Sequence, residues 1–437
     1  MKFLSSLLIL GGVQAVFGKT QLYGMNIAGF EFGCAITGDC PLTKIIIPPI
    51  ASLGGGDGAG QMSHFVKDDE MNIFRLPVSW QYLTNGVIGP LDKKNLANYD
   101  LLMQACLKTG AYCMIDIHNF ARWNGDIIGQ GGPTDLQFAD LWTQLATKYA
   151  NNSFVMFELM NEPHDLVIDT WAASCQAAVN AIRKAELVSH TILLPGLNFS
   201  SAGTFISSGW GAAMATVTNP DLSTDNIIFD LHKYLDIDNS GNHIECVMDN
   251  VKDTFVPVAA WLRKNKRQAI VSETGAGASD SCFIDFCAQN TAINDNSDVY
   301  LGYIAWTAGS VTSTYLLNLA PSKSGSKWTD QKMAVECVID VWVSALPATV
   351  SNTWGLTFAA GTPVTSSTVS KTSTTQSTAA ATTDTGSGSG ATQTQAGGVT
   401  KTIVPASGST GKSAASSVKV GSGLMGVCSL IFALVLL

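Results

Sequence analysis

The chain has 437 residues, of which 14% are charged, and its formal net charge at neutral pH is −9. Soluble globular chains carry roughly 25% charged residues, so part of this chain is expected to lie outside an ordinary folded domain. Contact with phosphates needs clustered Lys and Arg, and the 25 basic residues here form no run, so composition excludes a nucleic-acid-binding function.

The first 18 residues have the pattern of a secretory signal peptide. Lys2 precedes an apolar run at 3–10, and the small residues Ala15 and Gly18 offer cleavage sites after it. We therefore expect residues 1–18 to be removed and the mature protein to be extracellular.

From residue 19 to residue 346 the sequence repeats one pattern: an apolar run rich in β-branched residues, a polar or aromatic end, and a helical stretch. Eight such runs occur, at 22–30, 72–80, 111–120, 154–163, 191–199, 226–235, 269–277 and 300–309. Helical periodicity follows at 95–108, 135–149, 170–186 and 330–346. Near-continuous apolar strands imply a parallel sheet covered on both faces, and eight strand–helix repeats predict a (β/α)8 TIM barrel over 19–346. The alternative is an open doubly wound sheet, but no Gly-rich dinucleotide loop follows the first run.

The region after the barrel has the composition of a disordered stalk. Between Thr362 and Gly423 there are 15 Thr, 13 Ser and no aromatic residue. Such a segment cannot bury enough apolar surface to offset its chain entropy. We therefore expect residues 347–423 to form a Ser/Thr-rich, O-glycosylated stalk.

The last 14 residues, 424–437, are mostly apolar but too short to span a bilayer as a helix. Small residues around Ser413 and a polar spacer precede them, which is the pattern of a glycosylphosphatidylinositol (GPI) attachment signal. This pattern predicts a lipid anchor at the plasma membrane or cell wall as the only membrane contact. A weak tail anchor or an uncleaved apolar end is the alternative.

The cysteines fit an extracellular compartment. Cys428 lies in the apolar tail, and nine of the ten cysteines lie in the barrel region, so at least one of these nine stays unpaired. Most are candidates for disulfides, although their connectivity does not follow from spacing. No C-x-x-C pair occurs, which disfavours a zinc or thioredoxin-like site. Asn151 and Asn198 begin N-glycosylation sequons.

Six of the eight runs end in polar or aromatic side chains, which a parallel barrel gathers at one face. These residues are Arg75 in the second run, Asp116, His118 and Asn119 in the third, Asn161 and Glu162 in the fourth, His232 and Tyr234 in the sixth, Glu273 in the seventh and Trp306 in the eighth. Charged residues are rarely buried without partners, so this coincidence predicts an active site at the carboxyl ends of the strands.

Cleavage of a glycosidic bond needs at least two carboxyl groups, and Glu162 and Glu273 are a candidate pair among these residues. One carboxyl must be protonated to give a proton to the leaving oxygen, while the other must be ionised to attack the anomeric carbon, so their environments have to separate their pKa values. Arg75 and Tyr234 are available to keep one carboxylate charged, and Asn161 is placed to bind a sugar hydroxyl. A structural ion pair explains either glutamate alone but poorly explains the whole set.

Several of these positions lie in short motifs: FELMNEPH at 157–164, FRLP at 74–77, DIHN at 116–119, HKY at 232–234 and SETG at 272–275. Together they resemble glycoside hydrolase family 5, in particular its secreted fungal endo-β-1,4-glucanases, and the likeness runs from about residue 22 to residue 343. The resemblance implies a (β/α)8 barrel that hydrolyses β-1,4-glucan with net retention, with Glu162 as general acid/base and Glu273 as nucleophile.

The resemblance also implies roles for the surrounding residues. By it, Arg75 and Tyr234 hydrogen-bond the nucleophile, His118 and Asn161 contact the sugar, His232 orients the acid/base and Trp306 lies beneath the sugar ring. It further implies four disulfides and a free thiol at Cys175; the expected pairs are Cys34–Cys40, Cys106–Cys113, Cys246–Cys282 and Cys287–Cys337.

Four further residues are candidates for binding the polysaccharide: Trp80, Trp123, Asn119 and Phe199. Flat sugar faces stack on aromatic rings, and Phe199 stands where related enzymes tend to have Trp, so we expect weaker stacking there. Asp116, His118 and His232 are possible metal ligands, but retaining glycoside hydrolysis needs no metal and no cofactor is expected.

The function expected from the sequence is therefore an endo-β-1,4-glucanase that acts as a monomer on cellulose or mixed-linkage glucan. One alternative is another family 5 specificity, such as β-mannanase, β-1,3-glucanase or xyloglucanase, because the catalytic set is shared. The other is a surface protein that binds glucan without cleaving it, against which the intact Glu162 and Glu273 argue.

Overall fold

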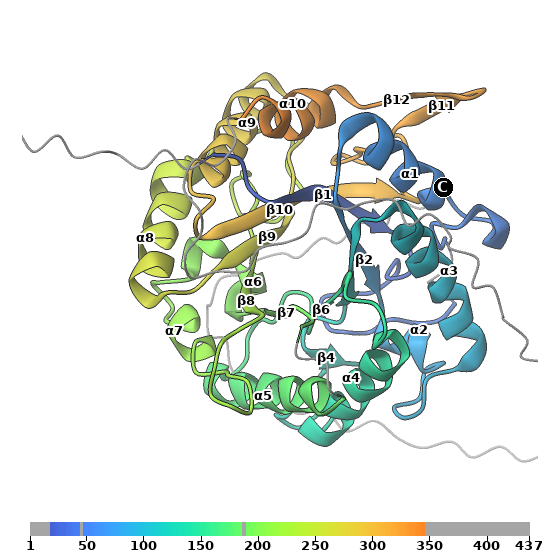
Figure 1. The fold of residues 1–437 in the computed structure, drawn as a ribbon, viewed down its shortest axis with the longest axis vertical. Helices are drawn as coiled ribbons and strands as arrows, with labels where there is room; N and C mark the ends of the chain where they lie inside the picture. Colours follow the sequence, from blue (N-terminus) through green and yellow to red (C-terminus); the bar gives the residue numbers. More distant parts are fainter. Residues whose placement is uncertain (1–17, 44–46, 186–188, 346–437) are drawn as a thin grey trace, which may run out of the picture. The chain divides into compact units, whose positions relative to one another are not determined.

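A computed structural model describes residues 18–43, 47–185 and 189–345. Eight strands close into a barrel in the order β1-β10-β9-β8-β7-β6-β3-β2, and all neighbouring strands are parallel (Figure 1). The strands are β1 (Leu22–Ala28), β2 (Ile73–Val78), β3 (Tyr112–Ile117), β6 (Val155–Glu158), β7 (Ile192–Leu194), β8 (Ile227–His232), β9 (Ala269–Thr274) and β10 (Tyr300–Gly309). Each strand lies within one of the eight apolar runs, so the predicted (β/α)8 barrel is confirmed.

Long helices surround the barrel (Figure 1): α1 (Gly58–Asp69), α3 (Lys93–Thr109), α4 (Asp135–Tyr149), α5 (Ile168–Lys184), α8 (Val256–Asn265) and α9 (Asp280–Asn294). Their ends follow from local sequence. Thr134 and Gln137 form a capping box at the start of α4, and Gly110 ends α3 in a left-handed conformation with φ 85°. The helices expected at 95–108, 135–149 and 170–186 correspond to α3, α4 and α5.

Shorter elements complete the connections. They are α2 (Trp80–Leu83), α6 (Leu197–Ser200), α7 (Trp210–Met214), α10 (Asp340–Val343), the 3-10 turns Ala51–Leu53 and Ala202–Thr204, the π-helical turns Val251–Phe255 and Ala334–Ile339, and the hairpins β4 (Arg122–Trp123) with β5 (Asp126–Ile127) and β11 (Ser322–Ser324) with β12 (Lys327–Thr329). The helix expected at 330–346 is thus a π-helical turn followed by the short α10.

The inside of the barrel is divided into an apolar layer and a polar layer. The apolar layer lies toward the amino ends of the strands and includes Ile73, Met114, Met156, Ile228 and Ile270. Side chains alternate along a strand, so the residue two positions later on each of these strands also faces inward. Those residues form the polar layer, which contains Arg75, Asp116, Glu158, Asp230 and Ser272, all fully buried. Buried polar groups need partners, and this layer supports the site above it.

Four disulfides join Cys34 to Cys40, Cys106 to Cys113, Cys246 to Cys282 and Cys287 to Cys337. Cys175 is a buried free cysteine in α5. The predicted pairing is therefore confirmed at every position.

The expected stalk at 347–423 and apolar tail at 424–437 lie outside the described residues, as does the expected signal peptide at 1–18 except for Gly18. Within 18–43, 47–185 and 189–345, no helix has the length and apolar character needed to cross a membrane.

Candidate active site

Two glutamates face each other at the carboxyl ends of β6 and β9. Glu273 is the penultimate residue of β9, and Glu162 lies four residues beyond the end of β6, where its left-handed backbone, φ 48°, turns the chain. One oxygen of Glu162 lies within 4.8 Å of one oxygen of Glu273. The side chain of Glu162 is 17% exposed and that of Glu273 is 7% exposed, so the acid that faces solvent more is Glu162.

Arg75 connects Glu273 to the polar layer of the barrel. Its Nη1 donates to Glu273 Oε2 at 2.7 Å, while its Nε and Nη2 donate to the two oxygens of Glu158, both at 2.6 Å. Nη2 also lies 2.9 Å from Asp116 Oδ2, and Nη1 donates to Asn26 Oδ1 at 3.0 Å. Burial alone lowers the pKa of Arg75, but Asp116, Glu158 and Glu273 raise it well above its ordinary value. Arg75 is therefore a fixed positive charge beside the carboxylate of Glu273.

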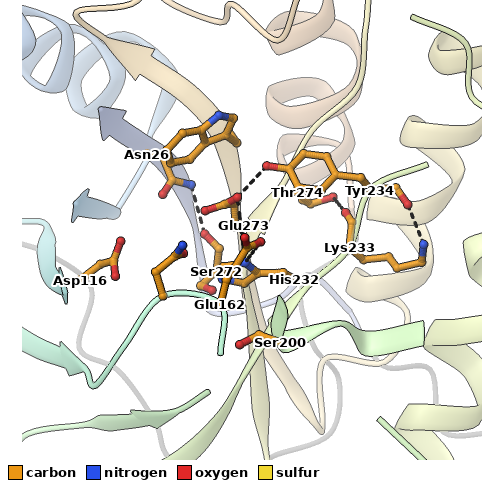
Figure 2. A network of polar contacts seen from close by, with 12 residues as sticks. Asn26, Asp116, Glu162, Ser200, His232, Lys233, Tyr234, Ser272, Glu273 and Thr274 are labelled. Carbon is orange, nitrogen blue, oxygen red and sulfur yellow. Dashed lines mark hydrogen bonds and ion pairs between the residues drawn. The ribbon is translucent and has the colours of Figure 1, made fainter. Parts of the chain in front are cut away.

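Tyr234 makes the second contact to Glu273. Its hydroxyl donates to Glu273 Oε1 at 2.7 Å, and Figure 2 shows the ring pointing toward that carboxylate. The backbone around Tyr234 is fixed by Lys233, whose Nζ donates to Tyr234 O and to Asn239 Oδ1, both at 2.7 Å. Thr274 Oγ1 donates to Lys233 O at 2.6 Å, which ties the end of β9 to the end of β8 (Figure 2). Glu273 thus accepts hydrogen bonds at both oxygens from rigidly held donors.

Glu162 has a different set of neighbours. Its Oε1 lies 2.9 Å from His232 Nδ1, and Figure 2 shows His232 beside it. Burial lowers the pKa of His232 to about 4, so this imidazole is neutral at neutral pH. Glu162 therefore contacts one neutral ring, whereas Glu273 contacts a charged guanidinium and a phenol.

These environments act on the acidity of the two glutamates. Burial raises the pKa of Glu162 to about 8, and Asp116 and Glu158 add to the rise while Arg75 opposes it. Burial also raises the pKa of Glu273 above its ordinary value, but the charged Arg75 beside it opposes that rise. Hydrogen bonds to a carboxylate favour its charged form. Of the two acids, Glu162 is thus the one suited to hold a proton at neutral pH.

His118 and Asn161 lie next to Arg75. Arg75 Nη2 donates to Asn161 Oδ1 at 2.8 Å, and Asn161 Nδ2 lies 3.3 Å from His118 Nε2. His118 Nδ1 lies 2.7 Å from Asp116 Oδ2, and burial lowers the pKa of His118 to about 3. The sequence predicts both residues at the carboxyl ends of the barrel strands. In the structure a continuous series of contacts runs from Arg75 through Asn161 to the neutral imidazole of His118.

Trp306 provides a half-buried aromatic surface beside this chain. Its ring lies parallel to that of His118, with centroids 5.8 Å apart and 15° between the planes. Trp306 Nε1 donates to Tyr315 Oη at 3.0 Å, which fixes the orientation of the indole. A flat indole held in this way is suited to stack against a sugar ring.

The other expected polysaccharide contacts differ in accessibility. Trp123 is half-buried, and Trp80, 1% exposed, packs edge-on behind it with centroids 5.3 Å apart. Asn119 is fully buried and its Oδ1 accepts from Trp80 N at 2.7 Å. Phe199 is half-buried and stacks on His164 at 4.4 Å. Trp80 and Asn119 thus support the position of Trp123, while Trp123 and Phe199 remain predicted contacts.

Comparison with known proteins identifies the family. The family described as Cellulase (glycosyl hydrolase family 5) matches residues 44–309, which is more than half of the chain. The chain belongs to glycosyl hydrolase family 5.

Two known proteins and one solved structure are similar to this family 5 chain. Endoglucanase EG-II of Hypocrea jecorina is 56% identical over 320 residues, which cover 72% of this chain and 76% of that protein. Endoglucanase 1 of Saitozyma flava is 44% identical over 310 residues, which cover 69% and 85% of the two chains. The crystal structure of Cel5A (EG2) from Hypocrea jecorina superimposes with a TM-score of 0.72 at 55% identity and covers 74% of this chain and 99% of that one.

Sequence reasoning missed part of the polar layer in this family 5 barrel. Asn26, Glu158, Asp230 and Ser272 contact Arg75, His232 or each other, yet none was predicted as a site residue. A signal was present in the alternation along each strand: Ile228, Asp230 and His232 share one face of β8, and only the last of the three was recognised.

Proposed function

We propose that this family 5 enzyme is an endo-β-1,4-glucanase that cleaves internal glucosidic bonds with net retention, using Glu162 as acid/base and Glu273 as nucleophile. The observation that carries the proposal is the short distance between the two acids, whose oxygens approach within 4.8 Å. Retaining enzymes hold their two carboxyl groups about 5–5.5 Å apart, whereas inverting enzymes need about 6.5–9.5 Å to admit a water molecule.

In the first step, Glu162 gives its proton to the glycosidic oxygen while Glu273 attacks the anomeric carbon. The bond from that carbon to the leaving oxygen breaks, and a covalent glycosyl ester forms on Glu273. Arg75 and Tyr234 hold the two oxygens of Glu273 at 2.7 Å each, which keeps the carboxylate aimed and favours its charged form before the attack.

In the second step, Glu162 has become a carboxylate and takes a proton from a water molecule. The water oxygen attacks the anomeric carbon, the ester bond to Glu273 breaks, and the sugar leaves with its original configuration. Two inversions at one carbon give net retention, so both glutamates are restored for the next turnover.

The substrate class is proposed from the relatives and from the aromatic residues. The similar proteins are named endoglucanases, and the half-buried Trp306 and Trp123 offer flat rings for the faces of glucose units. β-1,4-Glucan chains present flat faces of this kind along their length. Internal cleavage is proposed from the relatives, which are named endoglucanases.

The substrate proposal is tested by reducing-sugar release on four polymers with viscosity followed in parallel. The full chain is incubated with carboxymethylcellulose, barley β-glucan, laminarin and galactomannan. Rapid viscosity loss on the first two is the expected result. Activity confined to laminarin or galactomannan would keep the family and change the specificity, and no activity on any polymer would favour a glucan-binding protein.

We also propose that the enzyme is secreted as a monomer and held at the cell surface by a GPI anchor. The signal pattern at 1–18, the four disulfides and the tail pattern at 413–437 support this. Phosphatidylinositol-specific phospholipase C is expected to release endoglucanase activity from intact cells, and gel filtration of the released protein reports its size. Activity that stays on the cells would contradict the anchor and favour a tail anchor.

A further inference from the structure

Two buried polar atoms without hydrogen-bond partners lie beside each other beneath the catalytic glutamates. They are His232 Nε2 and Asp230 Oδ2, which are both unpartnered among the described residues and 3.6 Å apart. The two side chains are 1% and 0% exposed, so bulk water does not reach them. Buried polar atoms in native proteins are nearly always paired. At 3.6 Å these two atoms are slightly farther apart than the partners of a hydrogen bond, and a small approach that lets them share one proton satisfies both.

Ser272 indicates which oxygen of Asp230 carries a proton. Its hydroxyl donates to Asp230 Oδ1, so Oδ1 acts as an acceptor and Oδ2 is left facing His232. Asp230 is fully buried, and among the described residues Ser272 is its one hydrogen-bond donor and no Lys or Arg pairs with it. A buried carboxylate with so little compensation is favoured in its neutral form. Burial correspondingly raises the pKa of Asp230 well above its ordinary value, and the nearby Glu158 raises it further while Arg75 opposes the rise. A neutral carboxyl with its proton on Oδ2 is a donor, and the atom in front of it is His232 Nε2.

The hydrogen on His232 then has only one position. A neutral imidazole carries one hydrogen, and when Nε2 accepts from Asp230 that hydrogen is on Nδ1. Nδ1 lies 2.9 Å from Glu162 Oε1 and donates to it. Glu162 Oε1 is thereby an acceptor, so the acid proton of Glu162 is on Oε2, the oxygen left to face the leaving group.

We propose that Asp230 is a positioning residue that fixes the tautomer of His232 and thereby selects the oxygen of Glu162 that carries the catalytic proton. This inference rests on the proposed function of Glu162. In the first step the proton on Oε2 passes to the glycosidic oxygen, while the hydrogens on Asp230 Oδ2 and His232 Nδ1 stay where they are. The arrangement orients the acid without taking part in proton transfer.

Two substitutions at position 230 separate this role from a simple need for bulk. Asp230→Asn keeps an oxygen to accept from Ser272 and an NH2 to donate to His232 Nε2, so it mimics the protonated carboxyl. We expect its kcat on barley β-glucan to stay within about 3-fold of the wild type, while Asp230→Leu, which has no donor, loses about 10- to 100-fold. Equal losses in both variants would overturn the proposal, because they would mean that an ionised or merely structural carboxylate is needed.

A substrate that needs no acid distinguishes loss of proton positioning from general distortion. Dinitrophenolate leaves without protonation, so the pre-steady-state burst from 2,4-dinitrophenyl β-cellobioside reports the first step without the acid. In Asp230→Leu that burst rate is expected to remain within about 3-fold of the wild type, whereas hydrolysis of β-glucan falls. A burst rate lowered as much as β-glucan hydrolysis would overturn the proposal.

The tautomer itself is measured on the wild-type protein, which removes any dependence on how the variants fold. Nitrogen-15 NMR of the full chain labelled at histidine is expected to show His232 with hydrogen-bearing Nδ1 and hydrogen-free Nε2. The opposite tautomer would overturn the proposal. The NMR result tests the tautomer of His232 and does not depend on the proposed function. If the proposed function were wrong, Glu162→Ala would instead keep wild-type activity.

Discussion

Glu273→Ala is expected to lower kcat on barley β-glucan by several orders of magnitude and to regain turnover in sodium azide. Removal of the carboxylate abolishes the covalent intermediate, so the first step loses its nucleophile. The missing side chain leaves space beside Arg75 and Tyr234, whose donors point at the vacated position from 2.7 Å. Azide entering there attacks the anomeric carbon once and gives an α-glycosyl azide, which NMR of the product identifies.

The matched control is Glu31→Gln at the same barrel mouth. Glu31 is 4% exposed, and burial raises its pKa to about 8, so it is neutral at the assay pH of 6. A glutamine keeps the oxygen that accepts from Gly29 N, at 2.7 Å in the wild type, so wild-type activity is expected. A Glu273→Ala variant that turned over β-glucan like this control, with no azide product, would contradict the assigned nucleophile.

The barrel was predictable because each strand is covered on both faces. A strand packed between helices and the barrel interior is apolar along most of its length, so each strand stands out as one run even where it carries an inward polar residue. The helices at 135–149 and 170–186 were predictable from their single apolar stripe. The helix at 330–346 was harder, because a π-helical turn over Ala334–Ile339 changes the periodicity on which such a prediction depends.

The grouping of the candidate catalytic residues was predictable for a related reason, since the carboxyl ends of parallel strands meet at one mouth. Their partners were not. Arg75 pairs with Glu158, 83 residues away, and with Asn26, 49 residues away, and no local pattern encodes either contact. Asp230 was hidden inside an apolar run, because an inward polar residue is visible only once the inward face of the strand is known.

Burial also separates two kinds of aromatic residue that the sequence could not separate. Trp80 and Trp123 both follow strand ends, yet Trp80 is 1% exposed and packs edge-on against the half-buried Trp123. Composition and spacing do not determine which of the two indoles reaches solvent, because solvent exposure depends on packing between segments that are far apart in the sequence. Packing in three dimensions therefore decides which ring is available to a sugar.

Glu162→Ala is expected to lose several orders of magnitude in kcat on barley β-glucan but to keep the first step on 2,4-dinitrophenyl β-cellobioside. Dinitrophenolate leaves without a proton, so the burst of dinitrophenol remains, whereas the following hydrolysis slows because water lacks its general base. Azide attacks the glycosyl ester without a base, so on 2,4-dinitrophenyl β-cellobioside it restores turnover. The product is a β-glycosyl azide, the opposite anomer from the product of Glu273→Ala. An equal loss on both substrates would contradict the role of Glu162 as acid/base.

The pH dependence of the wild type follows from the same residue. Glu162 acts as an acid only while protonated, and its pKa is raised to about 8, so kcat/KM on β-glucan is expected to be retained below that pH and to fall as pH rises through it. The fall is absent for kcat/KM on 2,4-dinitrophenyl β-cellobioside, because that constant reports a first step that needs no proton. If kcat/KM fell at high pH with the same midpoint on both substrates, the titrating group would not be Glu162.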